Sequence, residues 1–118
     1  APVRSGELMK LARNGSGVWN TRYFMLGEGK LQYKDSTQSI IKGDISLHKA
    51  SITLLSPSDT GKYFCFQVIS AENILTLCAV TKDEMMAWAE DIYHGIAIAN
   101  GGGHILSVER DKAAIDML

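Results

Sequence analysis

The feature that most constrains the fold is a series of short apolar segments that turn residues interrupt about every ten positions. The segments alternate apolar and polar residues or are rich in aromatic and β-branched side chains, as β-strands are. They cover residues 7–11, 18–26, 30–34, 43–47, 51–55, 63–69 and 74–80. Seven strands at this spacing predict a β-sandwich or partly open barrel rather than alternating strands and helices.

After residue 80 the apolar period changes from that of a strand to that of a helix. Thr81 and Glu84 fit a capping box, in which Thr81 is the N-cap. The apolar stripe that follows consists of Met85, Trp88, Ala89, Ile92 and Ile96. We therefore expect one amphipathic helix that covers an open end of the barrel, with Trp88 as its core anchor.

The glycine run 101–103, preceded by Asn100, should end this helix and act as a flexible joint. Residues 104–118 either form a short second helix that packs on the domain or begin a part of the protein that this sequence lacks. Their apolar residues, partly on one helical side, are Ile105, Val108, Ile115 and Leu118. The expected organisation is one domain over residues 1–99 and a glycine-rich joint with a C-terminal extension over residues 100–118.

Composition limits the chain to one ordinary globular core. It has 118 residues, of which 46% are hydrophobic and 21% are charged, values typical of a single folded domain. No apolar run approaches the roughly 18–20 residues of a membrane-spanning helix. The N-terminus has neither an initiator methionine nor the apolar stretch of a signal peptide, so we expect a piece excised from a longer protein.

The charges are distributed unevenly along the chain. The net charge is −1, which argues against a general nucleic-acid binder. Residues 1–49 hold eight Lys and Arg against four Asp and Glu, whereas residues 50–118 hold four against nine. Either the surface charges simply fall unevenly, or the folded chain is polarised and presents one end to an anionic surface.

The two cysteines, Cys65 and Cys78, lack the spacing of metal ligands and suggest a reducing compartment. A tight turn around Ala71 and Glu72 would place them opposite each other on the outer face of the last hairpin. A cross-strand disulfide is one alternative, but two free thiols are the expected state.

No pattern in the sequence predicts catalysis. His48, His94 and His104 share no metal-like spacing with each other or with the cysteines. The sequence contains no phosphate-binding loop, HExxH motif or Ser/His/Asp arrangement. We therefore expect a non-enzyme without a metal or cofactor.

Several short motifs, in order and at the right spacing, resemble the pleckstrin homology (PH) domain family over about residues 5–98. Residues 6–10, Gly-Glu-Leu-Met-Lys, are similar to the opening "G-x-L-x-K", and residues 19–26 are similar to the second-strand pattern "W-x-x-R-x-F-x-L". Residues 31–34, the apolar pairs of the last hairpin and Trp88 continue the resemblance. It implies a seven-stranded, partly open barrel capped by one C-terminal helix.

The resemblance also implies a basic pocket at the first hairpin that binds acidic phospholipid head groups. In lipid-binding members a Lys ends the first strand and [Lys/Arg]-x-Arg follows in the second; Lys10 and Arg22 match the first and last of these positions. Converging Lys and Arg side chains can hold phosphate through charge-assisted hydrogen bonds. Further candidates for the head-group site are Arg13, Asn20, Lys34 and Lys42, and candidates for contact with the membrane interface are Val18 and Trp19.

One position departs from the family's pattern. Asn20 stands where the first basic residue of [Lys/Arg]-x-Arg belongs, and its amide donates hydrogen bonds without charge. This leaves two functions open: a membrane-targeting module for a phosphoinositide or a simpler lipid such as phosphatidic acid, or a protein-interaction platform without a lipid ligand. The first predicts a cytoplasmic module located peripherally on a membrane face.

Overall fold

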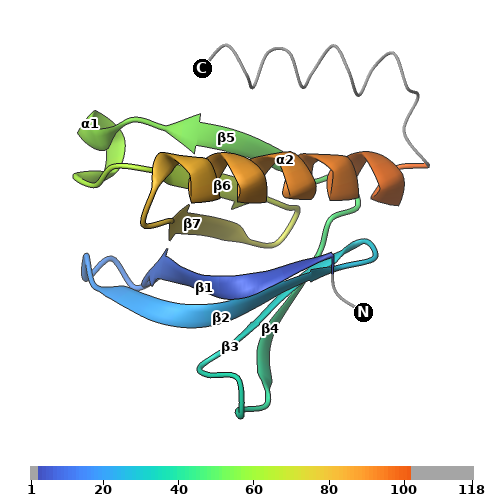
Figure 1. The fold of residues 1–118 in the computed structure, drawn as a ribbon, viewed down its shortest axis with the longest axis horizontal. Coiled ribbons are helices and arrows are strands. Elements are labelled where there is room, and N and C mark those ends of the chain that lie inside the picture. The colour runs from blue at the N-terminus through green and yellow to red at the C-terminus, as the bar shows by residue number, and fades with distance from the viewer. Residues whose placement is uncertain (1–2, 102–118) are drawn as a thin grey trace.

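The computed structural model describes residues 3–101, and these form seven strands and two helices (Figure 1). The strands and helices, in chain order, are β1 (Arg4–Leu11), β2 (Trp19–Gly27), β3 (Lys30–Lys34), β4 (Ile41–Ser46), β5 (Ser51–Leu55), α1 (Pro57–Thr60), β6 (Cys65–Ile69), β7 (Ile74–Cys78) and α2 (Lys82–Ala99). All seven predicted strands are present. The predicted second helix after residue 103 lies outside the described residues.

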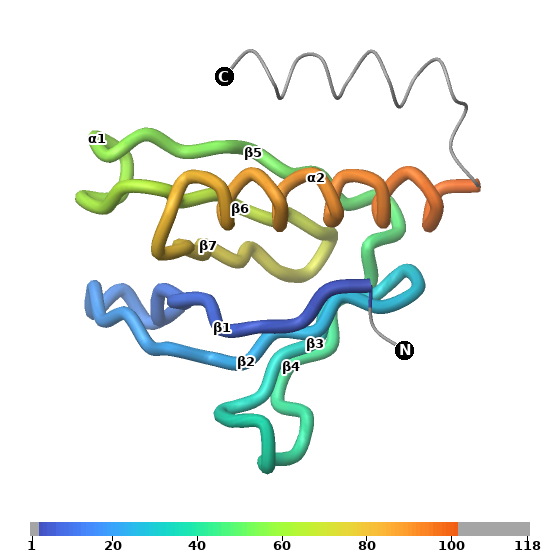
Figure 2. Tube along the Cα trace, in the orientation of Figure 1, coloured from blue at the N-terminus to red at the C-terminus, as the bar shows by residue number. Residues whose placement is uncertain are grey.

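The strands form one antiparallel sheet in the order β4-β3-β2-β1-β7-β6-β5. The sheet bends so that β1–β4 and β5–β7 make two layers (Figures 1 and 2). β4 and β5 are the two ends of the strand order, so the barrel is partly open, as predicted. Only two residue pairs, Met9 with Cys78 and Lys10 with Leu77, join β1 to β7. The layers therefore separate beyond Lys10.

The core fills the space between the layers. Alternation along the strands directs one side chain in two inward, and the fully buried ones include Phe24, Leu31, Phe66 and Leu77. Trp88 and Ile92 of α2 complete this cluster. These contacts close one end of the barrel, as the apolar stripe predicted.

Helix α2 begins at its predicted cap and packs on one end of the sheet. The backbone N–H of Glu84 donates to the side chain of Thr81 at 3.1 Å. Arg4, at the start of β1, forms a 2.6 Å ion pair with Asp91 of α2. Gly6 and Gly29 also lie against the helix, beside Trp88 and Ala99. The helix therefore covers the end of the β1–β2 hairpin that contains Arg4, and leaves the end near Lys10 open.

The predicted loop over residues 56–61 contains the short helix α1, which the sequence analysis missed. Ser56 caps it with Asp59, Pro57 lies in its first turn, and Gly61 ends it with φ of 77°. Ser, Pro, Asp and Gly are turn residues as well as helix-boundary residues, so a single helical turn has the same composition as a loop.

The prediction that the cysteines are free thiols is wrong. Cys65 and Cys78 face each other in the predicted register and form a disulfide. Both are buried, although alternation places them on the face opposite Phe66 and Leu77. Their sulfur atoms lie near the backbone carbonyls of Lys62 and Tyr63, so the chain that enters β6 covers them. The disulfide removes the argument that the cysteines gave for a reducing compartment.

Candidate functional site

The first hairpin places Lys10, Asn20 and Arg22 at the open end of the barrel. Lys10 pairs with Asn20, and Leu8 pairs with Arg22. Because alternate residues share a face, these polar side chains continue the inward row of Leu8 and Phe24, beyond the reach of α2. The strand ends therefore bring cations to the concave side of the sheet rather than to its solvent-facing back.

Lys10 lies at the centre of a group of cations. Partial burial lowers the pKa of its ammonium group below the ordinary 10.5, and the positive charges of Arg13, Arg22 and Lys42 lower it further. We call Lys10, Arg13, Arg22 and Lys42 the Lys10 cluster. The repulsion between like charges that are held together in this way is reduced when an anion binds between them.

Asp35 is a member of this site that the sequence analysis did not identify. Its carboxylate forms one ion pair with Arg22 Nε at 3.0 Å and another with Lys42 Nζ at 3.3 Å. Asp35 thus offsets part of the charge of the Lys10 cluster and ties β2 to β4. The only signal in the sequence was an acid directly after Lys34, at the end of a predicted strand.

The aromatic ring of Tyr33 lies next to the ammonium group of Lys10. The Lys10 ammonium lies 5.4 Å from the centre of the Tyr33 ring, within cation–π range. The ring also lies against Gly43 of β4, where a Cβ atom would come within 2.0 Å of it. Only glycine leaves this space, so Gly43 allows the Tyr33 ring to lie here.

Two of the predicted site residues point elsewhere. Lys34 pairs with Tyr23, and its ammonium lies 5.9 Å from the Tyr23 ring, on the face opposite Lys10. Arg13 donates a 2.9 Å hydrogen bond to Asn73 in the β6–β7 turn. The structure therefore brings Lys10, Arg22 and Lys42 together with Asp35, keeps Arg13 at the margin, and separates Lys34.

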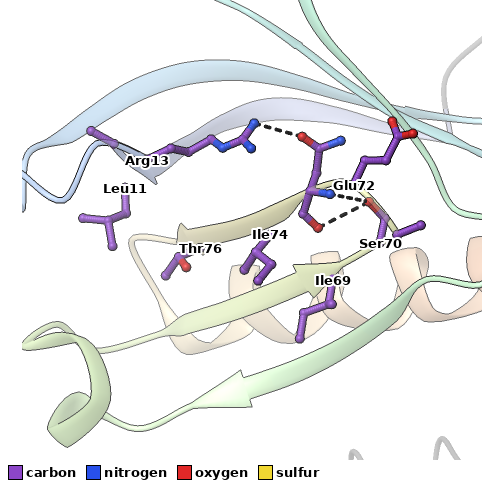
Figure 3. Close-up of a pocket in the computed structure, with 10 residues that line it drawn as sticks. Leu11, Arg13, Ile69, Ser70, Glu72, Ile74 and Thr76 are labelled. Carbon is purple, nitrogen blue, oxygen red and sulfur yellow. Dashed lines mark hydrogen bonds between the residues drawn. The ribbon is translucent and has the colours of Figure 1, made fainter.

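A groove of about 470 Å³ opens where β1 and β7 separate. Arg13 donates a hydrogen bond across it to Asn73, which in turn accepts and donates hydrogen bonds with Ser70; Figure 3 shows Arg13 and Ser70 among the residues that line the groove. Glu72 also lines the groove. An acid on this wall opposes binding of an anion there, so the Lys10 cluster is the better candidate for such a ligand.

Trp19 packs on the protein. The ammonium of Lys62 lies 5.7 Å from the centre of the Trp19 ring. Trp19 also lines a hollow with Asp59 and Thr60 of the α1 segment. Val18, next to it, is half exposed. Of the two predicted interface residues, Val18 is the more accessible.

The described residues contain neither a metal-binding group nor a membrane-crossing helix. No three His, Cys, Asp or Glu side chains within residues 3–101 are placed to hold a metal ion. No helix in that range is long and apolar enough to span a bilayer.

The described residues thus form an open antiparallel barrel with one capping helix and a cation cluster at its open end. The PH domain family model matches residues 2–97, and the chain belongs to the PH domain family. PH domains commonly bind phosphoinositides or proteins, and the fold is generally non-catalytic.

Curated relatives contain this domain within much longer proteins. The chain is 31% identical over 101 residues to the rat "Arf-GAP with coiled-coil, ANK repeat and PH domain-containing protein 2". This match covers 82% of the chain and 12% of the rat protein. It is 28% identical over 90 residues to mouse "Diacylglycerol kinase eta", covering 76% of this chain and 7% of the kinase. The chain thus spans only a small part of the curated relatives that it matches.

Solved structures share the fold. The carboxyl-terminal PH domain of pleckstrin matches with a TM-score of 0.72 and 25% identity, over 81% of this chain and 97% of that one. The same domain in complex with D-myo-Ins(1,2,3,4,5)P5 matches with a TM-score of 0.67 and 25% identity, over 85% and 99% of the two chains. That relative therefore binds an inositol phosphate.

Proposed function

We propose that this domain binds acidic phospholipid head groups through the Lys10 cluster and so recruits its parent protein to the surface of a membrane. The observation that carries the proposal is the position of Lys10, Arg22 and Lys42 at the open end of the barrel, with Arg13 at its margin. Partial burial lowers the pKa of Lys10, and these neighbouring positive charges lower it further. A phosphate group between them would exchange like-charge repulsion for charge-assisted hydrogen bonds, each contributing about 1.5–3 kcal/mol. The inositol phosphate bound by the pleckstrin relative supports this class of ligand.

Two features favour a head group with few phosphates. Asn20 adds no charge where lipid-binding members of the family have a cation, and Asp35 pairs with Arg22 and Lys42. Each reduces the positive charge available to a polyphosphate. The ligand that fits best is therefore a monophosphoinositide or phosphatidic acid, whose single phosphomonoester needs fewer cations.

Co-sedimentation with phosphatidylcholine vesicles that contain phosphatidylserine, phosphatidic acid or one phosphoinositide tests the proposal. We expect Lys10→Glu combined with Arg22→Glu to abolish pelleting while the domain stays folded. The matched control, Lys30→Glu with Lys82→Glu, makes the same charge change outside the Lys10 cluster and should retain selective pelleting. Equal binding of the cluster variant and the wild type would reject the site.

A protein-interaction platform is the second candidate function. β5 lies at one end of the strand order, and a mostly apolar hollow beside it is lined by Leu55, Phe64 and Met85. Tyr63 at its rim is 70% exposed. An extended peptide could add to such an edge. Partner binding that survives the Lys10/Arg22 reversal but is lost in Tyr63→Ser would favour this function.

A further inference from the structure

The connection between β3 and β4 exposes an apolar side chain beside the Lys10 cluster. Ile40 is 88% exposed, the highest value among the large hydrophobic side chains of residues 3–101, and the adjacent Ile41 is 50% exposed. Single exposed hydrophobic residues are ordinary on protein surfaces. The position of this pair is what distinguishes it, because Lys42, a member of the Lys10 cluster, follows directly in the chain.

Hydrogen bonds within the β3–β4 connection stabilise its shape. Ser39 N–H donates to the carbonyl of Ser36 at 3.1 Å, and the two hydroxyls lie 2.9 Å apart. At its base, Lys42 Nζ and the Asp35 carboxylate are 3.3 Å apart. These contacts form a closed turn, which projects from the β1–β4 layer in Figure 2. Ile40 is therefore presented by a turn with internal hydrogen bonds.

We infer that Ile40 enters the interfacial layer of an anionic bilayer when the Lys10 cluster engages a lipid phosphate; the inference rests on the proposed function. Ile41 pairs with Lys34 and so lies on the face opposite Lys10. Two residues of extended chain span at most about 7 Å, so Ile40 lies within that reach of the backbone of Lys42. Apolar side chains of peripheral proteins settle roughly 5–10 Å into the boundary between head groups and acyl chains. When Lys42 lies at the level of the lipid phosphate, the side chain of Ile40 two residues away is close enough to reach this boundary.

The exposure of Ile40 makes it a better candidate than Trp19 for insertion into the bilayer. That ring is partly buried and lies 5.7 Å from the ammonium of Lys62, so it is already engaged by the protein. Ile40 has no such packing, and burial in lipid would remove its apolar surface from water.

The test uses the full chain with Ile40→Ser, on phosphatidylcholine vesicles that contain a monophosphorylated phosphoinositide. Burying a large aliphatic side chain is worth at least a factor of about ten in partitioning, so we expect this variant to bind these vesicles roughly tenfold more weakly or worse. Ile98→Ser, which removes another exposed isoleucine from α2, should bind like the wild type. Binding of the soluble inositol phosphate head group, measured by calorimetry, should be equal in all three proteins.

A fluorescent label gives an independent readout. An environment-sensitive dye attached through Ile40→Cys should shift to the blue with these vesicles and not with the soluble head group. The native cysteines are joined to each other and do not compete for the dye. Unchanged vesicle binding of Ile40→Ser, while the Lys10/Arg22 reversal still abolishes it, would overturn this inference and leave the proposed function standing. Absence of vesicle binding by the wild type would instead reject the proposed function.

Discussion

Asp35 sets how much positive charge the domain presents to a ligand. Its carboxylate contacts both Arg22 and Lys42, two of the three cations around Lys10. An incoming phosphate must compete with this internal anion for the same donors. Affinity at this site therefore depends on one acid as much as on the cations, and the acid can be removed without touching them.

Asp35→Asn should strengthen binding to anionic vesicles. A cation near a membrane surface contributes about 1 kcal/mol, so releasing one equivalent of charge should raise affinity roughly fivefold. Co-sedimentation at two salt concentrations measures this, and the gain should shrink at the higher one. Asp44→Asn, which removes an acid paired with Lys30 at 3.8 Å, is the matched control. An equal gain in both variants would mean that net charge alone is responsible.

Lys10 makes head-group binding sensitive to alkaline pH. Burial and the neighbouring cations lower the pKa of Lys10, so its charge is lost at a lower pH than that of an ordinary lysine. A bound phosphate favours the charged form and raises this pKa, so binding takes up a proton in that range. Affinity for a soluble inositol phosphate should fall as the pH rises toward 10.5, and calorimetry across that range measures the fall. Lys10→Arg, which stays charged, should largely abolish it.

At the scale of the elements, the β3–β4 hairpin supports the site through one close contact. The ring of Tyr33 in β3 lies close against Gly43 of β4, and the Lys10 ammonium lies 5.4 Å from the centre of that ring. The register shifts between Tyr33 and Lys34, where Tyr33 pairs with Gly43 but Lys34 pairs with Ile41. This irregularity places Lys42 and Asp35 within reach of each other.

Gly43→Ala should therefore destabilise the domain and weaken the site together. The new Cβ would lie 2.0 Å from the Tyr33 ring, and displacing the ring should cost about 1–3 kcal/mol of unfolding free energy. Urea denaturation measures this loss. Gly27→Ala is the control, since a Cβ at Gly27 meets nothing within 4 Å, and should change the stability little. Equal stability of the two variants would show that Tyr33 can move at no cost.

The elements were predictable because their signals are local, whereas much of the site is not. Alternation and turn residues located all seven strands, and the stripe around Trp88 located α2. Resemblance to the family located Lys10 and Arg22. The role of Asp35 and the separation of Lys34 depend on which face each strand presents and on the register shift at Tyr33, which no local pattern encodes.

At the scale of the whole molecule, the Lys10 cluster makes the open end of the barrel basic. On α2, by contrast, positive and negative charges occur together, because Asp91 is paired with Arg4 and Lys82 precedes Asp83 and Glu84 in the first turn. A basic end orients a protein as it approaches an anionic surface.

The Cys65–Cys78 disulfide should contribute to global stability. It joins residues 13 apart in sequence, and closing a loop of about this length constrains the unfolded chain by about 3 kcal/mol. Urea denaturation with and without a thiol reductant should show a loss of that order in the reduced protein. The variant Cys65→Ala with Cys78→Ala should be indifferent to the reductant. Identical unfolding of the wild type in both conditions would contradict the expectation.

The two residue pairs between β1 and β7 also have a consequence for how the chain folds. The β1–β4 hairpins and the β6–β7 hairpin join neighbours in the sequence and can form early, but Met9 and Cys78 lie near opposite ends of the domain. Pairing residues that lie so far apart in the sequence first costs the entropy of closing a long loop, and this slows folding. The junction next to Lys10 is therefore where we expect the rate-limiting step of folding, so that the open end of the barrel is organised last.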